Sequence, residues 1–248
     1  MLLAVFAVSA AVTVRWCGAM AGGMPMPGGW TMSMAWMRMP GQRWPDAFAA
    51  FVAMWVTMMV PMMLPSLAPM LLRYRRTVHA ADDESLGART AVVAAGYLAV
   101  WGGVGILVYP CGVLAGAAAM HWDVIARAVP GATGVALLVA GAAQWTPWKA
   151  RRLAHCRTTP ACTAGLPSDA RTALRHGVDL GRHCAACCAG LMLVLLAGGV
   201  MDVRTMAVVA TAISAERLAP DGVRAARTAG LLLAAAGVST VARAAGLT

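Results

Sequence analysis

The sequence predicts an all-α protein, a polytopic transmembrane helical bundle that forms one domain over residues 1–248. Three observations support this prediction. Sixty per cent of the 248 residues are hydrophobic. Only 12% are charged, whereas charged residues make up roughly 25% of an average soluble chain. The apolar residues also come in long uninterrupted runs. A membrane β-barrel would alternate apolar and polar residues instead, and a disordered chain would be far less hydrophobic.

Seven apolar stretches are candidates for membrane-spanning helices, because a bilayer core of about 30 Å needs about 20 apolar helical residues. The first stretch is short, and no basic residue precedes Arg15, so we expect a retained helix more than a cleaved signal peptide. A cleaved signal would leave six spans. The stretches are 2–17, 47–71, 90–109, 128–146, 184–201, 204–219 and 229–247.

The basic residues predict the orientation in a bacterial inner (plasma) membrane. With the N-terminus inside, fourteen of the twenty Lys and Arg residues fall on the cytoplasmic side and six outside, as the positive-inside rule requires. This orientation predicts an external Met-rich loop at 18–45 and an internal basic loop with Cys and His at 147–183. The net charge of +10 is then explained by the basic residues of the cytoplasmic segments. We therefore expect the lipid bilayer, and not a nucleic acid, as the partner of this protein.

Methionine is concentrated in the first part of the chain, where fourteen of the eighteen Met residues lie within positions 1–70. Those of the second stretch recur at helical spacing and share one helix face in two rows. Met side chains on such a face either fill the core or act as soft thioether ligands that select Cu(I). The methionines of the external loop have no core to fill in this prediction, which favours metal capture there. The two rows consist of Met54, Met58 and Met62, and of Met59 and Met63.

Cysteines are concentrated on the expected cytoplasmic side, where thiols stay reduced. Cys184, Cys187, Cys188 and Met192 fall on one face at the start of the fifth stretch, and a helix N-terminus favours thiolates. One helix face cannot close a tetrahedral site, so a further ligand must come from elsewhere, with Cys156 the main candidate beside Cys162 and His155. The alternative is that these cysteines are small packing residues.

Two motifs resemble a bacterial family described as predicted metal-binding integral membrane proteins, a domain of unknown function. Residues 54–65 match the pattern MWxxMMxxMMxP, and Cys184 to Cys188 match CxxCC within a longer signature that runs from Gly177 to Pro220. Lys149, Cys156 and Pro160 resemble the preceding loop. The chain departs from the family pattern at Arg152, where a further Cys is usual, and at Ala189, where a Trp is usual. The resemblance implies a membrane protein that binds metal through these residues.

These features predict an integral membrane protein that binds a soft transition metal, copper above all, for capture, uptake or delivery. A metal ion and a metal-delivery partner or membrane complex are then its expected partners. One alternative is a copper-containing membrane oxidase or monooxygenase, or a subunit of one. Its redox centre would need His or carboxylate ligands, and few lie near the outer side, so we favour the copper-binding role over the enzyme. These few are His121, Asp123, Asp202 and Asp46. The other alternative is a metal-free structural membrane subunit.

Overall fold

The computed structural model describes residues 2–20, 22–78, 84–158 and 170–247. Within these ranges almost every residue is helical, which confirms the all-α prediction. A hairpin of β1 (Met24–Met26) and β2 (Trp30–Met32) and one short 3-10 turn (Met34–Trp36) stand between the first two helices. The helices are α1 (Leu2–Ala19), α2 (Trp44–Val78), α3 (Glu84–His121), α4 (Asp123–Ala143), α5 (Pro147–Thr158), α6 (Ala170–Gly198), α7 (Val203–Leu218) and α8 (Gly222–Ala244).

Each of the seven predicted apolar stretches lies in a helix of its own, apart from a few residues at the ends. Five helices in the described part of the chain are long and apolar enough to cross a membrane: α2, α3, α4, α6 and α8. The apolar helix α1 is shorter, and α7 has only 16 residues. Five helices are therefore compatible, by length and composition, with a multi-pass membrane protein.

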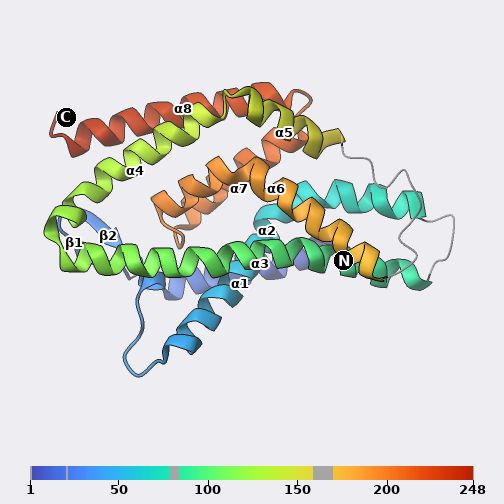
Figure 1. Cartoon of the computed structure of the whole chain (residues 1–248), viewed down its shortest axis with the longest axis horizontal. Helices are drawn as coiled ribbons and strands as arrows, with labels where there is room; N and C mark the ends of the chain where they lie inside the picture. The colour runs from blue at the N-terminus through green and yellow to red at the C-terminus, as the bar shows by residue number, and fades with distance from the viewer. Residues whose placement is uncertain (1, 21, 79–83, 159–169, 248) are drawn as a thin grey trace.

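The long helices lie roughly along the longest axis of the molecule, so the bundle has two distinct ends (Figure 1). The hairpin end, at the left in Figure 1, carries β1, β2, the α3–α4 turn and the C-terminus. The α5 end, at the right, carries α5 and the α7–α8 turn. Helix α5 is joined to the α7–α8 turn because Arg157 donates hydrogen bonds to the carbonyls of Glu216 (2.9 Å) and Pro220 (3.0 Å).

Glycines allow two helix pairs to pack at unusually short distance. Where α3 crosses α6, a Cβ on Gly177 would fall on the Val93 carbonyl. Where α4 crosses α8, a Cβ on Gly141 would lie 2.8 Å from the Gly230 carbonyl. Small residues at such crossings are typical of helices that pack inside membranes, where close van der Waals contact drives association.

Replacing Gly177 with Ala should therefore push α6 away from α3. We expect a loss of about 1–3 kcal/mol, as overpacked sites show, and a lower Tm in detergent micelles. Gly103 is a matched control on α3, since nothing lies within 4 Å of a Cβ placed there. An equal Tm for both alanine variants would contradict the close crossing.

The segment 147–183 differs from the loop that the sequence predicts. It contains α5 and the first turns of α6, which begins 14 residues before the predicted span at Cys184. Charged side chains such as Arg175 and Arg182 lower the hydropathy of this part of the helix, so the apolar pattern alone does not include it. Contact with α3 through Gly177 and Gly181 supports the helix there despite its polar sequence.

The hairpin buries two methionines that were expected to be exposed. Gly28, with φ of 98°, allows the tight turn, and the hairpin closes over the α3–α4 turn. Met26 and Met32 pack there against Ala119 and Ala126. The prediction that this loop has no core to fill is therefore wrong for these two residues, although Met24 and Met39 are exposed.

Candidate metal centre

The core of the bundle is rich in sulfur. All five methionines of the predicted rows on α2 are buried, with at most 5% of their surface exposed. Helical periodicity turns both rows to the inside, and the Trp55 indole fixes α2 against α3 by donating to the Trp101 carbonyl at 2.9 Å. Further sulfur atoms in the same core belong to Met192, Cys184 and Cys188 on α6, to Met201 and to Met206 on α7.

Two cysteines of α6 meet the end of the methionine rows. The Cys184 Sγ lies 4.0 Å from the Met63 Sδ and 4.0 Å from the Cys188 Sγ. Three sulfur ligands arranged trigonally around a soft metal ion at about 2.3 Å would stand about 4.0 Å apart. The Cys184–Met63 and Cys184–Cys188 distances therefore match two edges of such a site.

Polar groups in the core are directed at these thiols. The Tyr97 hydroxyl of α3 lies 2.9 Å from the Cys184 Sγ in a hydrogen bond, and the Arg217 Nη2 of α7 donates to the Cys188 Sγ at 3.7 Å. The guanidinium group is always charged, so it compensates negative charge on deprotonated sulfur. The sequence had suggested a helix N-terminus for this role, which is wrong because Cys184 lies in the middle of α6.

The third cysteine of the motif faces α5 instead of the methionine rows. Cys187 packs with Leu153 and Ala226, and Cys156 of α5 lies against this group. A hydrogen bond with the Cys187 thiol, together with burial, raises the pKa of Cys156. The CxxCC motif therefore connects two surroundings, the methionine core on one side and α5 on the other.

A buried ion pair holds α5 in place beside the thiols. The Lys149 Nζ lies 2.6 Å from the Glu216 Oε2 and donates to the Cys187 carbonyl at 2.8 Å. The Gln144 amide donates to the other carboxylate oxygen at 2.9 Å. Glu216 is 1% exposed and Lys149 is 4% exposed, so both charges of this pair are buried. The second acidic residue of this region, Asp202, caps α7, and hydrogen bonds led by the Thr205 hydroxyl lower its pKa.

The predicted site residues are thus brought together only in part. Met63, Cys184 and Cys188 are in contact, whereas Cys156 contacts Cys187. Met54 begins the rows nine residues before Met63, about 13 Å along the helix. Among the described residues no group of three or more His, Cys, Asp and Glu side chains is arranged to hold a metal ion. The further soft donor next to Cys184 is the Met63 thioether. Cys162 lies outside the described residues.

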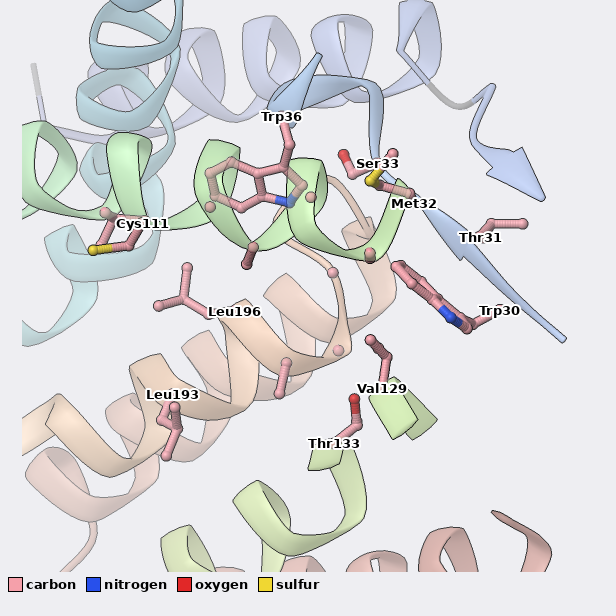
Figure 2. Close-up of a pocket in the computed structure, with 18 of the residues that line it drawn as sticks. Trp30, Thr31, Met32, Ser33, Trp36, Cys111, Val129, Thr133, Leu193 and Leu196 are labelled. Carbon is pink, nitrogen blue, oxygen red and sulfur yellow. The ribbon is translucent and has the colours of Figure 1, made fainter. Parts of the chain in front are cut away.

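A separate pocket of about 1010 Å³ lies at the hairpin end, between α3, α4, α6 and the hairpin (Figure 2). Its lining is mostly apolar, with Trp30 and Met32 from the hairpin and Leu196 from α6. In Figure 2 the Trp36 ring lies between Met32 and Cys111. The two sulfur side chains of this pocket are therefore kept apart, in contrast to the sulfur atoms of the core.

One of three comparisons with known proteins finds a match, and it is to a copper-related family. Residues 52–240, which include the methionine rows, α5 and the CxxCC motif, match the family model PpoB2, described as copper chaperone. No curated protein matches the chain, and no solved structure does. Since the match spans most of the chain, the protein belongs to the PpoB2 copper chaperone family.

Proposed function

We propose that the protein is an integral membrane copper chaperone that binds Cu(I) among Met63, Cys184 and Cys188. The observation that carries this proposal is the spacing of the three sulfur atoms, 4.0 Å on both edges that include Cys184, inside a chain of the copper chaperone family. Thioethers and thiolates are soft ligands that select Cu(I). Arg217 balances the charge of the thiolate complex, which a buried site requires.

The outer surface of the bundle supports an integral membrane protein. Large apolar side chains are exposed all along it, among them Leu107 (70%), Val124 (80%) and Leu232 (68%). Monomeric soluble proteins seldom expose so much apolar surface, whereas lipid tails would cover it. We assign the α5 end to the cytoplasm, because most of the arginines belong to segments at this end.

The order of the ligands favours inward movement of copper. The methionine rows extend from near the hairpin end of α2 to Met63, where the cysteines begin. Thiolates are stronger ligands for Cu(I) than thioethers, so affinity increases toward the α5 end. This gradient suits uptake or loading from the external side, with the hairpin segment at the entrance.

The orientation predicts the result of a fusion experiment. A reporter enzyme that is active only outside the cytoplasm should give no signal when fused after residue 165 and a strong signal when fused after residue 248. The physical reason is the concentration of basic residues around the first site. A strong signal from the first fusion would place the cysteines in an oxidising compartment and contradict the inward route.

Replacement of Met63 by Leu tests the proposed function directly. Leu conserves volume and apolarity, and such exchanges cost under about 1.5 kcal/mol of stability, so the bundle should fold. We expect the affinity for Cu(I), measured by competition with a chromogenic Cu(I) chelator, to fall at least about tenfold, or about 1.4 kcal/mol. Met32→Leu is the matched control, since Met32 is equally buried in the hairpin cluster. Equal affinities for wild type and Met63→Leu would assign the rows to packing.

A further inference from the structure

Two histidines meet at the α5 end of the bundle, outside the sulfur core. The imidazole rings of His155 on α5 and His183 on α6 are 4.4 Å apart between centroids and inclined by 51°. His155 is exposed and His183 half-buried, so both rings can be reached from the solvent at this end. The sequence pattern offers His155 only as a further ligand beside Cys156 and gives His183 no role.

A line of thiols connects this pair with the core. The Cys156 thiol donates to the His183 carbonyl at 3.5 Å, and Cys156 packs against the cluster that contains Cys187. Cys187 is followed in the chain by Cys188, whose Sγ lies 4.0 Å from that of Cys184. Each donor lies next to the following one, so a Cu(I) ion can exchange one ligand at a time along the line.

We infer that His155 and His183 form a second Cu(I) site, at which copper leaves the sulfur core for a cytoplasmic acceptor. The inference rests on the proposed function, since the copper reaches this site from Cys184 and Cys188. Neutral imidazole nitrogen is a common copper ligand, and Cu(I) accepts two-coordinate sites. Two-coordinate Cu(I) is linear and needs the ring centroids further apart than the observed 4.4 Å, so both side chains must rotate apart to direct one nitrogen of each ring at a shared ion.

The charges around the pair suit release better than storage. Arg152 and Arg182 are positively charged neighbours of His183, and Asp179 is its acidic neighbour. The net positive field weakens the binding of a cation, and nitrogen is a weaker ligand than thiolate for Cu(I). A ligand that arrives from the cytoplasm, such as a thiol or an anionic chelator, can therefore take copper from this exposed position.

The test compares copper release from wild-type protein and from the variant His155→Gln/His183→Gln in detergent micelles. Gln keeps size and polarity but offers no imidazole. Both proteins are loaded with one equivalent of Cu(I) without oxygen and then mixed with bathocuproine disulfonate, an anionic Cu(I) chelator. We expect equal copper content and a release rate about tenfold lower in the variant. His121→Gln is the control, because His121 ends α3 at the hairpin end.

A second measurement applies to samples loaded with two equivalents of Cu(I). X-ray absorption of wild type and His121→Gln should show imidazole scattering, which the double variant should lack while it keeps its sulfur shell. Unchanged release and unchanged imidazole scattering in the double variant would overturn this inference and leave the sulfur site intact. A wild-type protein without sulfur-bound copper would overturn both this inference and the proposed function.

Discussion

Replacement of both Cys184 and Cys188 by Ser should abolish stoichiometric copper binding. The two thiols stand 4.0 Å apart in the core, and the change removes both of them, including the Cys184 thiol that lies 4.0 Å from the Met63 sulfur. Because Ser is nearly as large as Cys, the cavity hardly changes. Copper content of the purified protein, measured by element-resolved mass spectrometry, should fall from about one equivalent to background.

The stability of alanine and serine variants separates a metal site from simple packing. If the cysteines only fill space, Ala should be tolerated better than Ser, whose buried hydroxyl needs a hydrogen-bond partner, and copper content should not respond to either change. If they are ligands, both variants lose copper equally. Cys111→Ser is the control, because Cys111 is an exposed cysteine at the hairpin-end pocket. Full copper content in the double Cys variants would contradict the site.

Replacement of Lys149 by Met should cause the largest loss of stability in the chain. It leaves Glu216 buried without its cation, and removal of one partner from a buried pair costs about 3–5 kcal/mol. The Cys187 carbonyl loses its 2.8 Å hydrogen bond at the same time. Since α5 is held to α6 and α7 through this lysine, we expect a strongly reduced Tm in detergent micelles.

A double variant provides the matched comparison for the ion pair. Lys149→Met/Glu216→Gln removes both charges, and Gln can still accept from Gln144, so most of the lost stability should return, as it does when buried pairs are replaced together. The coupling between the two positions is then read from the double-mutant cycle. If the double variant were as unstable as Lys149→Met, unpaired charge would not be the cause.

The sequence allowed the helices and the sulfur core to be predicted because both depend on periodicity. Met54, Met58 and Met62 recur every four residues, so a helix must place them on one face, and burial selects the apolar face. The position of Cys188 relative to Cys184 follows from the same rule. What the pattern could not give is the partner across the core, since contact between Cys184 and Met63 depends on how α2 and α6 cross.

The polar surroundings of the site could not be predicted for a related reason. Lys149 is the only lysine beside nineteen arginines, but nothing in the sequence shows that it pairs with Glu216 across the bundle. Tyr97 lies in an ordinary apolar stretch, and nothing in its neighbours marks it as a hydrogen-bond partner of Cys184. Helix α5 was not predicted because its many charged residues are typical of a loop. The helix is stabilised by contacts of Lys149 and Arg157 with segments distant in the sequence.

The central claim is that sulfur atoms from α2 and α6 bind one Cu(I) ion together. X-ray absorption of the purified protein, loaded with one equivalent of Cu(I), tests this claim most directly. The account predicts a first coordination shell of sulfur only, with about three ligands at about 2.3 Å. This shell should lose one sulfur atom in the Met63→Leu variant. A shell of nitrogen or oxygen, or a sulfur shell that is unchanged when Cys184, Cys188 and Met63 are replaced, would contradict it.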